Sequence, residues 1–355
     1  MLRAAMASPG RIEFTEVPKP TFGAEEVLLR IRRIGICGSD VHVYHGKHPY
    51  TSYPVVQGHE FSGEVAEVGA NVRGFTAGDL ATAPPQIVCG NCLPCREGRY
   101  HICENLKVIG FQAPGVAQEF FLFPQSSLLK LPRSFTPEVG ALVEPVAVAS
   151  HAVGRAGDVS RLGVLVLGAG PIGNLVAQVA RWRGARQVMV SEVSDHRLAI
   201  ARRCGITHAV NPRRESLEDR VTDVFGPDRA DVTFECVGLA ETANQAIRCV
   251  RKGGAVIVVG VFGECPPIDL GLVQDRELDV RGTLMYQRQD FVDAIRCLAE
   301  DSITVSPLLT RVFPFRHYAE AYAFVEENHE RVMKVMIDLD ESPNHLIGPG
   351  LAQAL

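Results

Sequence analysis

Apolar residues follow two different rhythms along the chain. Up to about residue 145, short apolar runs such as EVLLRIRRIGI, FSGEVAEVG and EFFLF are broken by glycine and proline, a pattern typical of a β-rich domain. From about residue 150 to 285, strand-like runs such as GVLVLGAG, QVMVSEV and DVTFECVG alternate with helical stretches such as NLVAQVARWRG and RLAIARRCG. This alternation predicts an α/β region in which helices flank a parallel sheet.

The last part of the chain, from about residue 286, mixes the two rhythms. It contains one expected amphipathic helix, FVDAIRCLAE, and short strands such as VMKVMID, and its final stretch, ESPNHLIGPGLAQAL, is expected to be loosely held. These changes of rhythm predict three consecutive parts, which cover residues 1–145, 146–285 and 286–355.

Composition excludes several classes of protein. The 355 residues are 46% apolar and 22% charged, the balance of a globular protein with an ample core. The net charge of −5 argues against a nucleic-acid partner, because phosphates are neutralised by clustered lysine and arginine. No apolar run is long enough to span a membrane, and MLRAAMASPG lacks the apolar region of a signal peptide. We therefore expect a cytoplasmic protein with reduced cysteines.

Four cysteines are concentrated in one short stretch, CGNCLPCREGRYHIC, as Cys89, Cys92, Cys95 and Cys103. Reduced thiols at this spacing can surround one tetrahedral zinc ion. Because all four ligands are cysteines, no coordination position is left for water or substrate, so the sequence predicts a structural zinc site. Five further cysteines are expected to be small buried apolar residues: Cys204, Cys236, Cys249, Cys265 and Cys297.

A glycine motif opens the strand–helix region. Gly168, Gly170 and Gly173 form G-x-G-x-x-G directly after an apolar strand and before a helical run, and Glu192 stands where the next strand ends. In this context the first glycine permits a tight turn, the second lets the backbone approach a pyrophosphate, and the third packs helix on strand. The motif predicts a dinucleotide site, with Glu192 accepting hydrogen bonds from the adenosine ribose.

A third cluster of reactive residue types lies in the β-rich region. GICGSDVH supplies Cys37, Ser39 and His42, GHEFSG supplies His59 and Glu60, and LVEPVAV supplies Glu144. A cysteine, a histidine and a carboxylate make a zinc set that can leave a position open. Taken separately, each residue has an ordinary structural explanation, such as a core thiol or a turn histidine. Beside a dinucleotide site, an open zinc position implies alcohol oxidation.

These motifs together resemble the zinc-dependent medium-chain dehydrogenases. GHEFSGEVAEVGANV resembles the family's zinc signature, and the four-cysteine stretch, the glycine motif, ECVG and VVGVFG recur at similar places. The Glu144–Pro145 pair is closest to the polyol, sorbitol dehydrogenase-like branch. The resemblance implies a Rossmann domain over 146–285 that binds NAD. It also implies a GroES-like catalytic domain over 1–145, which residues 286–355 complete.

The resemblance also implies roles at the catalytic zinc. Cys37 and His59 are expected ligands, while Glu60 and Glu144 coordinate directly, alternately or through water. Asp40 is expected to orient His59, and Ser39 and His42 to relay the proton. Lys334 stands where the family often carries a cation behind the zinc, although a solvated lysine is an equal alternative. With the four-cysteine site, two zinc ions per chain are predicted.

Cofactor and substrate contacts follow from the same resemblance. Residues expected at the cofactor are Gly168, Gly170, Pro171, Ile172, Gly173, Glu192, Arg197, Val259, Gly260, Val261, Thr283, Leu284 and Met285. Residues expected at the substrate are Val43, Glu144 and Tyr286. Glu192 predicts a preference for NAD over NADP, because a carboxylate repels the 2′-phosphate.

The substrate class is left broad by the sequence. Sorbitol dehydrogenases carry an aromatic residue where this chain has Val43, and Arg–Tyr where it has Met285–Tyr286, which weakens the case for sorbitol. HGKHPYTSYPVVQGHE is more similar to bacterial members that act on sugar acids or other polyhydroxy compounds. We expect a homotetramer that oxidises a small polyhydroxy substrate. A sugar-acid or threonine-type dehydrogenase, a zinc-free quinone or enone reductase, and a non-catalytic NAD-binding protein are the alternatives.

Overall fold

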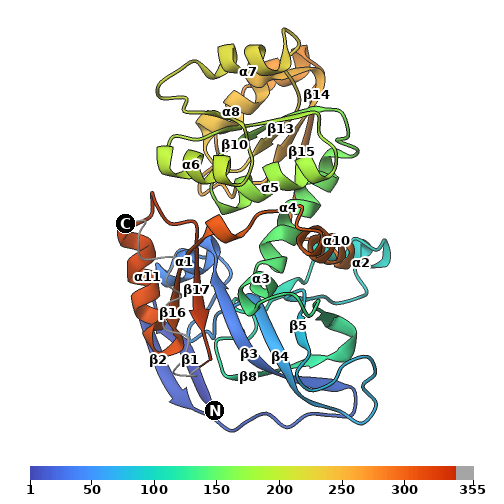
Figure 1. The fold of residues 1–355 in the computed structure, drawn as a ribbon, viewed down its shortest axis with the longest axis vertical. Helices are drawn as coiled ribbons and strands as arrows, with labels where there is room; N and C mark the ends of the chain where they lie inside the picture. Colours follow the sequence, from blue (N-terminus) through green and yellow to red (C-terminus); the bar gives the residue numbers. More distant parts are fainter. Residues whose placement is uncertain (341–355) are drawn as a thin grey trace.

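The structure, a computed structural model, describes residues 1–340. Two lobes are visible in Figure 1, with a parallel sheet and its helices above and a mostly antiparallel sheet below. Segments far apart in the sequence meet in the lower lobe, because the C-terminal strand β17 (Lys334–Asp338) pairs antiparallel with β3 (Glu26–Ile36). The last described residues thus complete the β-rich sheet. The expectation for residues 341–355 lies outside the described residues.

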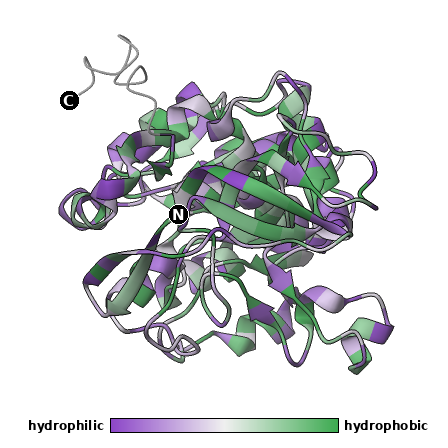
Figure 2. Cartoon of the chain, turned by 90° about the horizontal axis from the view of Figure 1, so that it is seen from below, coloured by the Kyte–Doolittle hydropathy of each residue, from purple (hydrophilic) through white to green (hydrophobic). Residues whose placement is uncertain are grey.

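The lower lobe is built on one mixed sheet. Within residues 1–340 its strands follow the order β16 (Leu309–Pro314), β17, β3, β4 (Glu60–Val68), β5 (Leu80–Thr82) and β9 (Leu129–Lys130), and β8 (Phe120–Pro124) also pairs with β3. Two small antiparallel pairs accompany it: β1 (Leu2–Ser8) with β2 (Arg11–Glu16), and β6 (Gln86–Ile87) with β7 (Lys107–Val108). Seen from this end of the molecule, the long central strands are mostly hydrophobic (Figure 2).

The upper lobe is a parallel sheet of Rossmann order. Its strands run β12 (His208–Val210), β11 (Gln187–Ser191), β10 (Gly163–Leu167), β13 (Ala230–Glu235), β14 (Val250–Val258) and β15 (Asp279–Gly282). Strand β10 is fully buried: Val164 and Val166 pack into one core cluster and Leu165 and Leu167 into another. Two buried faces explain why this strand is a continuous apolar run rather than an alternating one.

Helices cover both faces of the parallel sheet and join the two lobes. Helix α4 (Val143–Ala156) packs on both α5 and α10, and α4 and α10 lie between the lobes in Figure 1. The other helices are α1 (Gly38–Tyr44), α2 (Leu93–Arg96), α3 (Pro137–Ala141), α5 (Pro171–Trp182), α6 (Asp195–Arg203), α7 (Leu217–Phe225), α8 (Ala240–Cys249), α9 (Leu270–Asp275), α10 (Arg288–Ala299) and α11 (Tyr318–Glu327). The predicted boundary at residue 145 falls inside α4, and the domain limits stay a prediction.

Three expectations meet the structure here. The predicted α/β fold with its parallel sheet and β-rich domain is confirmed. The expectation of a single helix after residue 286 is wrong, because α11 follows α10. The expectation of five buried thiols is wrong for Cys265, which is exposed, and for Cys236, which is half-buried. Within residues 1–340, no helix is both long and apolar enough to cross a membrane.

Candidate metal and cofactor site

Cys37 lies at the start of α1, where the chain leaves strand β3. It is the N-cap residue of the helix, and its backbone N–H donates to Asp40 Oδ2 at 2.9 Å. This reciprocal cap fixes the first turn. The Ser39 hydroxyl donates to Cys37 Sγ at 3.2 Å. The cap therefore holds the sulfur and the predicted relay serine side by side.

A chain of buried polar groups stands behind His59. His59 Nδ1 lies 3.5 Å from Asp40 Oδ1 and makes no hydrogen bond within residues 1–340. Gln57 Nε2 donates to the same carboxylate oxygen, and the Tyr322 hydroxyl donates to Gln57 Oε1 at 2.8 Å. Burial opposes the charged form of His59, yet Asp40 and Cys37 raise its pKa well above the usual value. The predicted pairing of Asp40 with His59 is present, and Gln57 and Tyr322 extend it.

The structure brings Cys37, His59 and Glu60 together, with one ligand atom from each within 4.8 Å of the others. His59 and Glu60 are buried, and Cys37 is half-buried. A thiol, an imidazole and a carboxylate that converge in this way match the donors of an open zinc site. The residues therefore fit the zinc ion that the sequence predicts.

Glu60 faces a buried lysine. Lys334 Nζ lies 2.7 Å from both carboxylate oxygens, and Lys334 and Glu60 are 4% and 1% exposed. Burial opposes the charged ammonium, but Glu60 and Cys37 raise the pKa of Lys334. The alternative of a solvated lysine is wrong. Gly35 makes room for this pair, because a Cβ there would lie 2.1 Å from Glu60 Oε2.

Glu144 lies in the first turn of α4 and is 5% exposed. The Tyr286 hydroxyl donates to Glu144 Oε1 at 2.5 Å. Burial, followed by the charge of Glu60, raises the pKa of Glu144 to about 7. Its ligand atoms are not part of the 4.8 Å cluster among the described residues. Whether Glu60 or Glu144 coordinates directly stays a prediction.

The four-cysteine stretch forms a compact lobe around α2. Cys103 Sγ lies 3.5 Å from Cys89 Sγ and 3.8 Å from Cys92 Sγ, and one sulfur from each of the four cysteines belongs to the cluster. Zinc–sulfur bonds of about 2.3 Å in a tetrahedron place sulfurs about 3.8 Å apart. Backbone N–H groups of Asn91 and Cys92 lower the pKa of Cys89 to about 6. The lobe fits a structural zinc ion.

The predicted cofactor residues gather at one edge of the parallel sheet. They follow the carboxyl ends of four strands: Gly168–Gly173 follow β10, Glu192 follows β11, Val259–Val261 follow β14, and Thr283–Met285 follow β15. Ligands of open parallel sheets bind at this edge. Gly168 has a φ of +90°, and a Cβ on Gly173 would lie 1.9 Å from the Gly168 carbonyl oxygen.

Glu192 is already held by the backbone before any cofactor contact. Its carboxylate accepts from Ala169 N–H and Ser194 N–H, each at 3.0 Å, and it is 7% exposed. Arg197 Nη1 lies 3.8 Å from Glu192 Oε2 and Arg197 Nη2 donates to the His329 carbonyl. The predicted acid and its arginine neighbour therefore lie together at the glycine turn.

Sequence reasoning missed a second buried carboxylate at this edge of the parallel sheet. Glu235, at the end of β13, accepts from the N–H groups of Val237 and Gly238 and from the Thr242 hydroxyl. Gly238 has a φ of +86°, and a Cβ on Gly260 would lie 2.3 Å from Gly238 N. The quoted ECVG carries the signal, an acid that ends an apolar strand before glycine. This carboxylate shapes the loop that meets the predicted cofactor residues.

Not every predicted contact is brought to the site. Val43 is completely buried in the β-rich core, so its predicted substrate contact has no support here. His42 is exposed on α1, and no hydrogen bond joins it to Ser39 within residues 1–340. Tyr286 is fully buried and reaches the site through Glu144.

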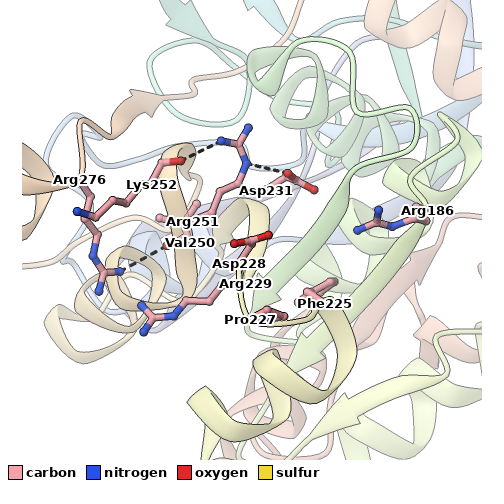
Figure 3. A pocket seen from close by; sticks show the side chains of 10 residues that line it. All are labelled: Arg186, Phe225, Pro227, Asp228, Arg229, Asp231, Val250, Arg251, Lys252 and Arg276. Carbon is pink, nitrogen blue, oxygen red and sulfur yellow. Dashed lines mark hydrogen bonds and ion pairs between the residues drawn. The ribbon is translucent and has the colours of Figure 1, made fainter.

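A large surface hollow lies away from this site. Its volume is about 840 Å³, and Asp231, Arg251 and Lys252 line it at the amino ends of β13 and β14 (Figure 3). Arg251 pairs with Asp231, while Arg229 and Arg276 donate to the Arg248 carbonyl at the end of α8. Cations at a helix C-terminus satisfy its free carbonyls. These arginines are therefore explained by the fold.

Comparisons with known proteins agree with this geometry. Two family models match: a zinc-binding dehydrogenase over residues 171–300 and an alcohol dehydrogenase GroES-like domain over residues 23–133. The 2-dehydro-3-deoxy-L-galactonate 5-dehydrogenase of Pseudoalteromonas atlantica is 37% identical over 89% of this chain and 92% of its own length. The L-threonine 3-dehydrogenase of Legionella pneumophila (strain Corby) is 34% identical over 90% of this chain and 94% of its own length.

A solved structure extends the comparison to three dimensions. A zinc-binding dehydrogenase from Sinorhizobium meliloti 1021, bound to NADP, superposes with a TM-score of 0.86 at 30% identity and covers 95% of this chain and 98% of its own. The matches cover both lobes and the regions that hold both clusters of potential zinc ligands. The chain therefore belongs to the zinc-dependent medium-chain dehydrogenase family.

Proposed function

We propose that this dehydrogenase oxidises a secondary alcohol of a small polyhydroxy compound to the ketone, with NAD as the hydride acceptor. One observation carries the proposal. Tyr286 directly follows the predicted cofactor residues Thr283–Met285, and its hydroxyl donates to Glu144, whose pKa is raised by burial and then by the charge of Glu60. This hydrogen bond joins the residue that follows the predicted cofactor positions to a buried carboxylate whose charge interacts with Glu60, one of the clustered potential zinc ligands.

The chain's own residues would act mainly by positioning and by proton transfer. Bound zinc supplies Lewis acidity to a hydroxyl group, and the nicotinamide ring accepts hydride. Asp40 holds the His59 ring from behind. Lys334 neutralises the charge of Glu60. The Ser39 hydroxyl, which donates to Cys37 Sγ, is proposed to take the proton, and exposed His42 is proposed to release it to solvent.

The names of the relatives support two substrate classes. 2-Dehydro-3-deoxy-L-galactonate and L-threonine both carry a carboxylate and a secondary hydroxyl, so a sugar-acid or threonine-type substrate is as well supported as a neutral polyol such as butanediol. The NADP-bound relative leaves the choice of cofactor to experiment. The arrangement at Glu192 supports NAD, because its buried carboxylate is fixed at the glycine turn.

A substrate panel tests the proposal. The zinc-loaded enzyme is assayed for NAD reduction with alditols, aldonates and L-threonine, beside His59→Ala and Ser39→Ala variants. We expect turnover of at least one secondary alcohol, loss of turnover in His59→Ala, and a fall of about 100-fold in kcat for Ser39→Ala, the scale of general acid–base catalysis. No turnover with any secondary alcohol, with either NAD or NADP, would contradict it.

A further inference from the structure

One histidine near the metal cluster has no role in the mechanism above. His48 lies on the loop after α1, and its ring stacks on Phe111 with ring centres 4.7 Å apart. Phe111 in turn contacts the His59 ring, with centres 4.9 Å apart. His48 therefore lies one aromatic ring away from a predicted zinc ligand. That separation suits a group a few carbon atoms from the reacting hydroxyl.

The His48 ring is held in one orientation. Thr51 Oγ1 lies 2.7 Å from His48 Nδ1, and together with the Phe111 stack this contact fixes the ring. No protein group within residues 1–340 pairs with His48 Nε2, and that atom is not among the buried unpartnered ones. When Nδ1 accepts from the Thr51 hydroxyl, the ring proton lies on Nε2. A donor of fixed direction is then open to solvent.

The one carboxylate that acts on His48 is already paired with other groups. Burial lowers the pKa of His48, Asp40 raises it, and His42 and His59 lower it further. Asp40 is the one carboxylate in this set, and it is buried and already engaged by His59 and Cys37 N–H. Lys47, the preceding residue, is exposed. Among the described residues that act on His48, no free carboxylate competes with an anionic ligand for its ring.

We propose that His48 binds a terminal anionic group of the substrate, a carboxylate or a phosphate, while the secondary hydroxyl lies at the Cys37, His59 and Glu60 cluster. This inference rests on the proposed function and narrows its substrate class to acidic polyhydroxy compounds. His48 is thus a specificity-determining residue rather than part of the proton path.

Matched substrates test the role of the anionic group. Each pair has the same secondary hydroxyl, with and without the charge: L-threonine and L-threoninol, L-idonate and L-iditol, galactitol 1-phosphate and galactitol. We expect the wild-type enzyme to prefer an anionic member. His48→Ala should raise KM for that member about 10- to 100-fold, the scale of a hydrogen bond to a charged group. In this variant, kcat for the anionic member and kcat/KM for the neutral member should each change less than about threefold.

Two further variants separate a direct contact from general effects. His48→Arg should restore most of the affinity for the anionic substrate, because the guanidinium supplies new donors. Lys47→Ala removes an adjacent exposed charge and should change KM by less than about threefold. The carboxylate and phosphate pairs then show which anion the site accepts.

Two outcomes would overturn the inference. In the first, neutral members are preferred. In the second, His48→Ala lowers activity equally on both members of a pair, as a purely structural role would. Both outcomes leave the dehydrogenase activity in place, so they are distinct from failure of the proposed function. Absence of turnover on every pair contradicts the proposed function and this inference together.

Discussion

Buried ionisable side chains crowd the candidate metal centre. Glu60 and Glu144 are both buried, and Lys334 pairs with Glu60 but not with Glu144. The second carboxylate is left with a tyrosine hydroxyl, so its pKa rises to about 7. A buried pair of acids with one cation is a costly arrangement unless a metal ion adds positive charge. The stability of the metal-free protein should therefore depend on pH.

Glu144→Gln tests this sensitivity. Because the folded-state pKa of Glu144 is raised, its contribution to stability is present in acid and is lost as pH rises through about 7. In protein stripped of metal, the variant should match wild type near about pH 4, below the ordinary glutamate pKa of 4.5. It should be more stable by up to roughly 3 kcal/mol near about pH 8 in urea unfolding. Added zinc should reduce this difference in stability between the variant and the wild type.

Glu138→Gln is the matched control, because burial opposes its charge but Arg33, 2.8 Å away, lowers the pKa of Glu138. Stability from that pair is present at neutral pH and lost in acid, so the control should be destabilising near about pH 8. A Glu144→Gln difference that is the same at both pH values would contradict the account of the two buried acids.

Gly35→Ala tests the position of Glu60. A Cβ on Gly35 would lie 2.1 Å from Glu60 Oε2 and 3.1 Å from Glu60 Cβ, so the carboxylate and Lys334 must move. We expect kcat/KM to fall more than about tenfold, with overpacking costing about 1–3 kcal/mol of stability. Gly263→Ala, where a Cβ would meet nothing within 4 Å, is the control. Unchanged kinetics in Gly35→Ala would show that Glu60 has no part in the centre.

Glu192→Ala tests cofactor choice. The wild-type carboxylate lies at the glycine turn, where it should disfavour NADP by about 2–4 kcal/mol, or roughly 30- to 1,000-fold in kcat/KM. Arg197, with Nη1 3.8 Å from Glu192 Oε2, can then face a phosphate in the variant. The preference for NAD over NADP should be smaller in the variant than in the wild type, mainly because the KM for NADP falls. Similar kcat/KM for the two cofactors in the wild-type enzyme would refute this interpretation of Glu192.

At the scale of elements, the sequence was most informative where periodicity and turn chemistry agree. EVLLRIRRIGI coincides with β3, and the glycine motif is followed by α5 as predicted. Helix α11 was missed, and it packs against strands β16 and β17 near the C-terminal end of the chain. Its aromatic residues Tyr318 and Tyr322 are fully buried or nearly so, which blurs the amphipathic pattern.

Contacts between distant residues were the other limit of the sequence. Cys37, His59 and Glu60 could be recognised by family motifs, since their spacing is short. The pairing of Lys334 with Glu60 depends on β17 lying beside β3, and the Tyr286–Glu144 bond joins two lobes. Neither follows from local pattern. Val43 shows the opposite error, because its position after the relay histidine suggested a contact that burial removes.

At the scale of the whole molecule, the parallel sheet ends in an exposed edge. Strand β15 pairs with β14 on one side, and within residues 1–340 no strand covers its other side. Val280 on this strand is 49% exposed. An open strand edge, with its unpaired backbone groups, is a template for pairing with a second copy. The predicted homotetramer would use it, and light scattering at micromolar concentration should give an oligomer; a monomer mass would contradict this.

The central claim is that the chain holds a catalytic zinc on Cys37, His59 and either Glu60 or Glu144, and a structural zinc on its four-cysteine lobe. Metal content of the purified protein, measured by elemental analysis beside turnover, tests it most directly. We predict two zinc ions per chain in the wild type. His59→Ala should keep one zinc and its fold but lose turnover. Cys95→Ser should lose the structural zinc of the four-cysteine lobe and much stability, since structural zinc contributes about 10–16 kcal/mol to folding in small zinc peptides. One metal ion or none in the active wild-type enzyme would contradict the account.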